Sequence, residues 1–447
     1  MANREGDRPE AGTAPPKGAL LVVFLTVFID LLGFGIVLPV MPRQAEPYLT
    51  ALGLPPAGIG AMIGVLFSVF SLMQFVFSPI WGRLSDRIGR RPLLILSLLG
   101  SVVFYALYGF AVTFPEEQAL TAVGLMLLSR IGAGIAGASV GTAAAVIADC
   151  TPPERRARGM ALIGIAFGAG FTLGPLIAYF GLALFRRQPW GVGALASVLS
   201  LVALLIAIFI FRETRRPGSR SAKEFPSMMR TAAVLGMPAV GALVLTYFLA
   251  IFAFANFEAT LARLTKQSFG MTDDGNFLVF AFIGVVLVIA GGLYRPLAKR
   301  VPEGRLLESG VAMMILGLGG LGLVAAMVHR HGPGGSPSFL ETMFFVVASV
   351  AVVGFAFVNP SVSALISRSA DPERQGEVLG VNQSFASLGR ILGPFLGSVL
   401  FSLHASGTLP FVAAVVVLLA VAALLPRATR VSGSGHTARA GGGEASG

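Results

Sequence analysis

Charge is scarce in this sequence of 447 residues. Asp, Glu, Lys and Arg make up only 12% of it, and 55% of the residues are hydrophobic. Soluble domains carry roughly twice that share of charged residues. Because each membrane-spanning helix needs about 20 residues, the chain has room for about a dozen of them. The composition therefore predicts a multi-pass protein embedded in a lipid bilayer.

Residues that support catalysis or bind metals are also few. The single cysteine, Cys150, excludes an internal disulfide and a metal-binding pair of cysteines. The four histidines fall near predicted helix ends or in a tail, and the sequence contains no ATP-binding loop and no nucleophile constellation. We therefore predict that the protein is neither an enzyme nor an ATP-driven pump and needs no cofactor.

Two sets of six apolar runs lie on either side of a polar, basic linker. We place the predicted helices at residues 18–42, 56–80, 92–113, 118–149, 157–184 and 190–211, then at 237–264, 274–296, 305–328, 339–368, 376–403 and 408–426. The predicted organisation is a disordered tail (1–17), a six-helix bundle (18–211), a linker (212–236), a second six-helix bundle (237–426) and a disordered, Gly/Ser-rich tail (427–447).

Lys and Arg are distributed unevenly between the two sides of this predicted topology. On the side that holds the N-terminus lie 25 of the 33, and the loops of the other side hold six. Because positively charged loops stay in the cytoplasm, we predict that both termini are cytoplasmic, in a bacterial inner membrane. The net charge of +11 then reflects membrane orientation and does not indicate a nucleic-acid partner. We expect a monomer.

An internal repeat relates the two halves. The tripeptide Pro153-Glu154-Arg155 recurs at 372–374, and the Gly-Pro pair at 174–175 recurs with the same offset at 393–394. Such repeats are typical of transporters built from two related halves, and an even number of helices between the copies gives both halves the same orientation. We predict hinges in the fifth and eleventh helices at Gly170, Gly174, Pro175, Gly389, Gly393 and Pro394.

The stretch Gly82–Pro92 holds four arginines and one aspartate between two apolar runs. A segment so basic cannot lie in hydrocarbon, so we expect a tight cytoplasmic turn between the second and third helices. We predict that Asp86 caps or pairs near Gly376 and that Asp149 accepts from a neighbouring arginine. These contacts would form a cytoplasmic gate from Gly82, Arg83, Asp86, Arg87, Gly89, Arg90 and Asp149. The alternative is a basic anchor with no further role.

Four charged residues fall inside predicted helices. Asp30 lies about 15 Å into the first helix, and Glu258 lies in the outer half of the seventh. Arg130 and Arg390 lie in the fourth and eleventh helices. Ionisable groups at such depth are costly and normally face a cavity or a partner. We predict that these four residues couple transport to protons, with buried structural ion pairs as the alternative.

Several of these motifs resemble those of a known family. The pattern Gly-x-Leu-x-Asp-Arg-x-Gly-Arg-Arg at 82–91 resembles the signature loop of major facilitator transporters. Asp30, followed by Gly33-x-Gly35 and Pro39, resembles the first helix of the drug:proton antiporter branch, especially tetracycline efflux proteins. The glycines before Gly174-Pro175 resemble the fifth helix of the same antiporters. This resemblance implies a twelve-helix fold and export driven by a proton gradient.

We predict a central cavity that alternately opens to each side of the membrane. An apolar cavity with a few polar anchors suits amphipathic organic molecules. Its candidate lining residues are Phe34, Gln74, Tyr247, Asn256, Asn359, Asn382, Gln383 and Phe385. The predicted function is proton-coupled efflux of such molecules. The alternatives are a uniporter or proton symporter for a sugar, organic acid or lipid-like metabolite, and a membrane sensor or scaffold that transports nothing.

Overall fold

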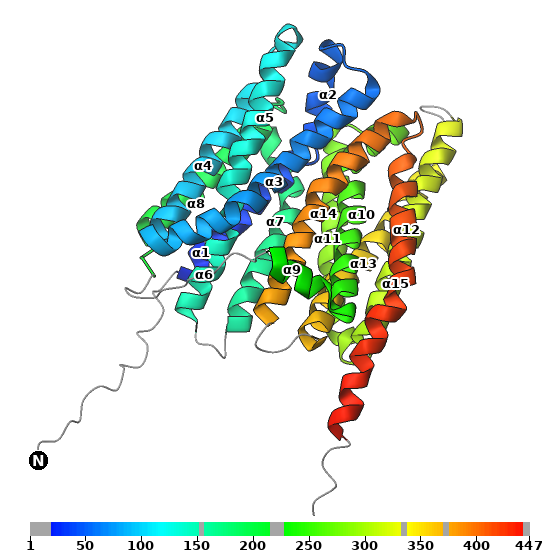
Figure 1. The fold of residues 1–447 in the computed structure, drawn as a ribbon. Coiled ribbons are helices and arrows are strands. Elements are labelled where there is room, and N and C mark those ends of the chain that lie inside the picture. Colours follow the sequence, from blue (N-terminus) through cyan, green and yellow to red (C-terminus); the bar gives the residue numbers. More distant parts are fainter. Residues whose placement is uncertain (1–18, 152–155, 215–227, 332–337, 370–374, 441–447) are drawn as a thin grey trace, which may run out of the picture.

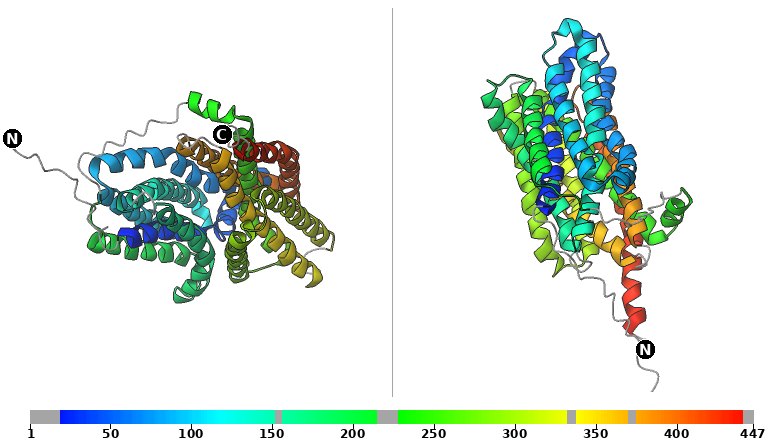
Figure 2. Two further views of the ribbon diagram at one scale, coloured as in Figure 1. Left: turned by 90° about the horizontal axis from the view of Figure 1, so that it is seen from below. Right: turned by 90° about the vertical axis from the view of Figure 1, so that its left-hand side faces the viewer.

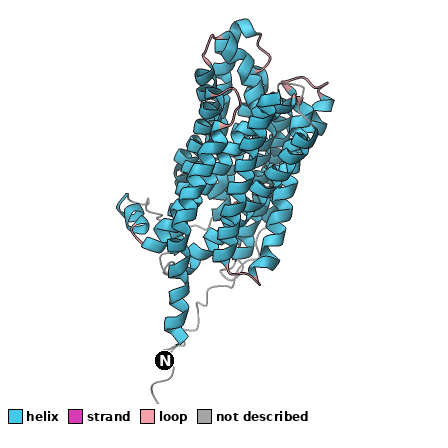
Figure 3. Cartoon of the chain, turned by 90° about the vertical axis from the view of Figure 1, so that its right-hand side faces the viewer, coloured by secondary structure: helices cyan, strands magenta, loops and turns pink. Residues whose placement is uncertain are grey.

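The computed structural model describes residues 19–151, 156–214, 228–331, 338–369 and 375–440. Within these ranges the chain is almost entirely helical and contains no strand (Figure 3). By length and composition, eleven helices could cross a membrane, and Thr172–Leu184 forms a shorter apolar helix. The predicted all-α membrane fold is therefore confirmed.

The N-terminal bundle comprises the elements from α1 to α8. Their bounds are α1 Ala19–Val37, α2 Met41–Ala51, α3 Pro56–Ile88, α4 Arg90–Ala111, η1 Glu116–Gln118, α5 Ala119–Ala136, η2 Gly137–Ser139, α6 Val140–Cys150, α7 Arg156–Leu184 and α8 Gly191–Ile210. The predicted first helix is interrupted after Val37, where Pro39 cannot donate a backbone hydrogen bond. The predicted fourth helix is interrupted by the 3₁₀ turn η2.

The C-terminal bundle comprises the helices from α10 to α15 and is preceded by the short helix α9, Met228–Leu235. Its helices are α10 Pro238–Phe269, α11 Asp273–Ala298, α12 Glu303–His331, α13 Ser338–Ser369, α14 Gln375–Leu403 and α15 Leu409–Ala440. Pro238 occupies the first turn of α10, and Gly270, with φ 61°, ends it in the left-handed conformation. Where we expected a flexible tail from residue 427, α15 continues to Ala440.

The two bundles stand side by side (Figure 2). Figure 1 shows α2 at one end of the molecule, which we call the α2 end, and α9 toward the other, the α9 end. Helix α3 packs against α14, and α7 packs against α11. Two hydrogen bonds mark these contacts: Ser68 Oγ donates to the Ile391 carbonyl at 2.6 Å, and Thr172 Oγ1 donates to the Gly284 carbonyl at 3.1 Å.

The sequence repeat is also a structural repeat. A Cβ added at Gly170 would lie 3.0 Å from both the Phe28 carbonyl oxygen and the Leu32 nitrogen of α1. At Gly389 it would lie 2.9 Å from the Phe248 carbonyl oxygen and 3.1 Å from the Phe252 nitrogen of α10. The two glycines are equivalent in the sequence repeat, so the helices that they contact, α1 and α10, are equivalent as well. Each predicted hinge glycine therefore provides a close contact between two helices of one bundle.

Candidate functional site

The signature stretch differs from the predicted turn. Helix α3 continues through Gly82 to Ile88, and only Gly89, with φ 107°, separates it from α4. Residues with a side chain rarely adopt this conformation, so glycine is required there. The polar part of α3 extends beyond the apolar run because a helix satisfies its own backbone hydrogen bonds outside hydrocarbon as well. The expected turn is therefore confined to Gly89, and the predicted helix ends at 80 and 92 were wrong.

Arg90 is the centre of a charged cluster at this junction. The residue is only 7% exposed, and its side chain pairs with Asp86 at 2.6 Å and with Asp149 at 3.1 Å. It also donates to Ser85 Oγ at 2.5 Å. Asp149 thus accepts from one of the predicted arginines. The surroundings of Gly376, where we expected a partner for Asp86, lie outside the described residues.

Glu213 completes the cluster and was not predicted. Its carboxylate accepts from the backbone nitrogens of Arg90 at 2.9 Å and Arg91 at 3.1 Å. An acid at a helix N-terminus satisfies free N–H groups and interacts favourably with the helix dipole. A Cβ at Gly89 would collide with this carboxylate. The sequence could have suggested this partner only through the position of Glu213, three residues after the end of α8.

At the α2 end, Arg43 reaches from α2 into the C-terminal bundle. Its side chain is buried and donates to Asp273 Oδ1 at 2.8 Å, to the Met271 carbonyl at 2.9 Å and to the Ala262 carbonyl at 3.2 Å. Thr265 Oγ1 lies within 3.4 Å of the same guanidinium. Because a buried guanidinium must have its donors satisfied, these contacts hold α2 firmly against α10 and α11. In the predicted topology, Arg43 was one of the six charges in the loops of the outer side.

Further contacts between the bundles surround Arg43. Asn276 donates to the Pro39 carbonyl at 2.6 Å, and Glu46 pairs with Lys266 at 3.3 Å. Arg187 pairs with Asp274. Among described residues, the inter-bundle hydrogen bonds and ion pairs extend from this end no deeper than Ser68–Ile391 and Thr172–Gly284. Those contacts lie about 18 Å along their helices.

One side of α10 carries two aromatic residues and a carboxylate. Tyr247, Phe254 and Glu258 are separated by seven and eleven residues, so they lie on one side of the helix. Thr265 lies on the same side and contacts Arg43. Tyr247 and Phe254 are buried, whereas Glu258 is partly exposed. The structure thus places a partly exposed carboxylate on the same side of α10 as these aromatic residues.

Helix α13 contributes two side chains beside this surface. Asn359 accepts a hydrogen bond from the Tyr247 hydroxyl at 2.8 Å, and the Phe355 ring stacks on Phe254 with centroids 3.8 Å apart. Asn359 remains exposed while bonded to Tyr247. The result is an aromatic wall with polar groups at its edge.

Arg390 of α14 lies near this wall. It interacts electrostatically with both Glu258 and Tyr247. Within the described part of the chain, its one hydrogen bond is to Ser387 Oγ at 3.3 Å, and it forms no ion pair with Glu258. Arg390 is partly exposed, as is Glu258. Opposite charges on two membrane helices therefore lie close enough to interact without neutralising each other directly.

In the N-terminal bundle, Arg130 of α5 is 1% exposed. Its guanidinium lies 4.5 Å from the centroid of the Phe70 ring, an arrangement that stabilises a cation in an apolar environment. Tyr105 and Tyr108 of α4 also interact with it electrostatically. The side chains of Asp30 and Phe34 lie outside the described residues, so their roles remain predictions.

The other predicted lining residues occupy two kinds of position. Gln74 donates to the Gly137 carbonyl at 3.0 Å, Asn256 is buried and donates to the Pro410 carbonyl at 3.3 Å, and Asn382 is buried in α14. Phe385 packs edge-on against Phe248. These residues help to hold helices together, whereas Gln383 is exposed.

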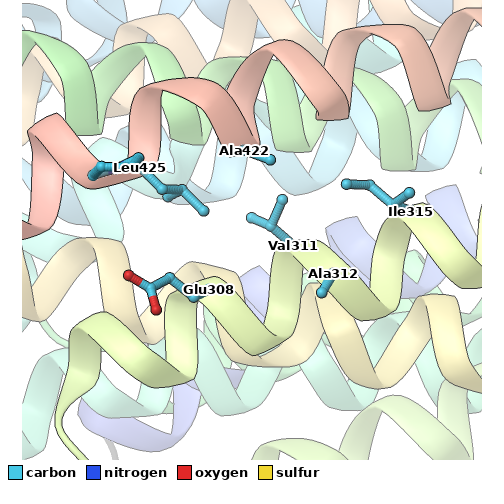
Figure 4. A pocket seen from close by; sticks show the side chains of 7 residues that line it. Glu308, Val311, Ala312, Ile315, Ala422 and Leu425 are labelled. Atoms are coloured by element: carbon cyan, nitrogen blue, oxygen red, sulfur yellow. The ribbon is translucent and has the colours of Figure 1, made fainter.

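A groove lies apart from these residues, between α12 and α15 (Figure 4). Its lining is apolar except for one carboxylate: Glu308, Val311, Ala312, Ile315, Ala422, Leu425 and Pro426. None of the predicted site residues lines it. In the part of the chain that the structure covers, no group of three His, Cys, Asp or Glu side chains could hold a metal ion.

Known proteins resemble the chain over both bundles. A family model described as Major Facilitator Superfamily matches residues 23–340 and 311–444. Major facilitator superfamily domain-containing protein 10 of Bos taurus is 30% identical over 431 residues, which cover 86% of this chain and 87% of the relative. The class E tetracycline resistance protein of Escherichia coli is 30% identical over 390 residues, which cover 86% and 88%.

The crystal structure of the human organic anion transporter MFSD10 is also similar. Its TM-score is 0.61 at 25% identity, with 92% of this chain and 100% of that chain covered. The family match includes the signature stretch, the repeat and the helices that carry Glu258 and Arg390. The chain therefore belongs to the major facilitator superfamily.

Proposed function

We propose that this transporter exports amphipathic organic compounds in exchange for protons. Relatives that are named for tetracycline resistance and for organic anion transport support an organic substrate. The aromatic wall of α10 and α13, with polar groups at its edge, provides a surface for a molecule that is partly apolar and partly polar.

The observation that carries this proposal is the pair of opposite charges at Glu258 and Arg390. Charged groups in membrane helices are costly and persist where they serve a pathway or a partner. These two are partly exposed on helices of the C-terminal bundle and form no direct ion pair in the described chain. They are thus available to ligands that enter between the bundles.

Transport requires the protein to open alternately to each side. The contacts of Arg43 tie the bundles at the α2 end, which the Lys/Arg distribution predicts to be outside. We assign this conformation to the state closed toward the outside. In the other state, the contacts of Arg43 break and the charged cluster around Arg90 approaches the C-terminal bundle at the α9 end.

The proton gradient does work only if protons bind differently in the two states. Asp30 is the first candidate for the proton carrier because of its depth in α1, and Glu258 is the second. A carboxylate whose exposure alternates can take up a proton from one side and release it to the other.

Proteoliposomes with a trapped pH-sensitive dye provide the test. After a pH gradient is imposed, amphipathic anions, neutral molecules and cations are added in turn, with protein-free liposomes as the control. We expect at least one class to move against its own gradient and to speed the collapse of the pH gradient. Substrate movement that ignores pH would favour a uniporter, and no movement of any class would favour a sensor or scaffold.

A further inference from the structure

We propose that Arg390 binds an anionic group of the substrate, so that the transported compounds are amphipathic organic anions. This inference rests on the proposed function, which leaves the chemical class of the substrate open. It is carried by the orientation of Arg390, by its lack of a strong partner and by the groups beside it.

The contacts of α14 fix the direction in which Arg390 points. Gly389 and Gly393 face α10, whereas Ile391 and Phe395 face α3 of the other bundle. At about 100° per residue, Arg390 lies between these two packed sides.

The remaining side of α14 carries exposed leucines, Leu392, Leu396 and Leu403, and therefore faces lipid. This side is roughly opposite Arg390. The guanidinium consequently points into the interior between the bundles and not toward the hydrocarbon of the membrane.

The donors of Arg390 are largely unused. A guanidinium has five N–H donors, and in the described chain Arg390 uses one of them in a long bond of 3.3 Å to Ser387. By contrast, buried Arg43 bonds to a carboxylate and two carbonyls at 3.2 Å or less. Arg390 is partly exposed, so a ligand can reach the donors that the protein leaves free.

The neighbours of Arg390 suit the rest of such a ligand. Gln383 lies two turns away on the same side of α14 and is exposed. Tyr247, which interacts electrostatically with Arg390, is oriented by its bond to Asn359. Phe355 of α13, which stacks on the buried Phe254, is partly exposed and supplies an apolar ring for an aromatic group. A planar guanidinium matches the geometry of a carboxylate or sulfonate, which it can bind through two parallel hydrogen bonds.

Glu258 then has a different role from that of a proton carrier. With no substrate bound, its carboxylate is the opposite charge that acts on Arg390. A bound anion would take over this role. This assigns Glu258 to charge balance and leaves proton transfer to Asp30. An anion leaving the cell and a proton entering it both move positive charge inward, so an inside-negative membrane potential would favour the exchange.

Binding of a matched pair of probes to the purified protein in lipid nanodiscs tests the inference. Naphthalene-2-sulfonate and naphthalene-2-sulfonamide have nearly the same shape and differ in charge. We expect wild type to bind the sulfonate roughly 10-fold to 100-fold more tightly, as is typical of hydrogen bonds to charged groups. Arg390→Gln should remove this preference, and Arg390→Lys should restore part of it. Glu258→Gln should tighten sulfonate binding, because it removes a competing negative charge.

Arg330→Gln, at the exposed end of α12, is the matched control and should leave both affinities unchanged. Equal binding of the two probes by wild type, no binding of the sulfonate, or an unchanged preference in Arg390→Gln would overturn the inference. If Arg390→Gln does not fold, the affinities of the two probes for wild type and Glu258→Gln still test the inference. Proton-driven transport of neutral compounds alone would refute the anion site and leave the proposed function intact. Sulfonate binding without proton-driven transport would support the anion site and refute the proposed function.

Discussion

At the scale of single residues, this transporter concentrates its chemistry in a few charges within apolar helices. Arg130 is buried against an aromatic ring, whereas Arg390 and Glu258 are partly exposed. The same residue type is thus buried in one bundle and partly exposed in the other, where we propose that it binds a ligand. Burial and hydrogen-bond partners distinguish these uses, and residue identity alone does not.

Asp30→Asn tests the proton carrier. An amide cannot take up and release a proton, so we expect the variant to lose uphill transport driven by pH while it still folds and binds ligand. The measurement is substrate accumulation in proteoliposomes under an imposed pH gradient. Glu258→Gln, assayed alongside, should keep proton-driven transport if Glu258 only balances charge. Wild-type accumulation by Asp30→Asn would show that the proton carrier lies elsewhere.

Glu213→Ala tests the newly found partner of α4. The substitution removes the acceptor for two backbone N–H groups, and losses of this kind typically cost about 1 kcal/mol of stability. We expect a lower midpoint of thermal unfolding in detergent, with Glu117→Ala, in the exposed turn η1, as the control. Equal midpoints for Glu213→Ala and wild type would argue against a stabilising role for this carboxylate.

At the scale of elements, α2 adds charged contacts between the bundles to the packing of α3 on α14 and α7 on α11. It is short, it follows the break after α1, and Arg43 in its first turn is bonded to α10 and α11. Within the described ranges, the deepest hydrogen bonds between the bundles join α3 to α14 and α7 to α11. We therefore expect α2 to move away from α10 when the α2 end opens.

Arg43→Gln should accordingly open this end more often. The variant loses the ion pair with Asp273, so the population should shift toward the state open at the α2 end. A cysteine at Ser68, which is buried in the contact between α3 and α14, reports opening in a Cys150→Ala background. We expect an impermeant thiol reagent, added from outside, to label it several-fold faster in Arg43→Gln. Arg186→Gln, an exposed substitution at the same end, is the control. An equal labelling rate in Arg43→Gln and wild type would show that the contacts of Arg43 do not keep this end closed.

At the scale of the whole molecule, two bundles repeat one arrangement of helices. The glycines of α7 contact α1 as those of α14 contact α10, so both bundles are built around equivalent helix pairs. The charges do not follow this repeat: when α10 is aligned with α1 so that Phe248 matches Phe28, Glu258 corresponds to Leu38. Under the proposed function, repetition would supply the scaffold for rocking, and the departures from it would supply the ligand and proton sites.

Membrane orientation is testable on the whole chain. The bias of Lys and Arg predicts that the linker is inside and the loop after α12 outside. Single cysteines are introduced at Ser219 and Gly334, both outside the described residues, in a Cys150→Ala background. An impermeant reagent applied to intact cells should label the cysteine at 334 and not the one at 219. Lysed cells, in which both positions should react, provide the control. The reverse pattern would invert the topology.

The sequence by itself determined the number and order of the apolar helices, the division into two halves, and the family. These properties depend on local composition and on spacing along the chain, which a single sequence contains. It also identified Glu258, Arg390 and Arg130, because a charge in an apolar run is visible without any structure.

Only the tertiary structure decided which side chains meet. Glu213 and Arg43 were ordinary loop charges in the sequence, and the partners that they contact lie in distant parts of the chain. The sequence also does not show which way a helix is rotated. It therefore could not tell that Asn256 packs against α14 and α15 while Glu258, two residues later, faces another direction. The physical reason is that lipid is as apolar as the protein interior, so a membrane helix shows little of the periodicity that reveals the buried side of a soluble helix.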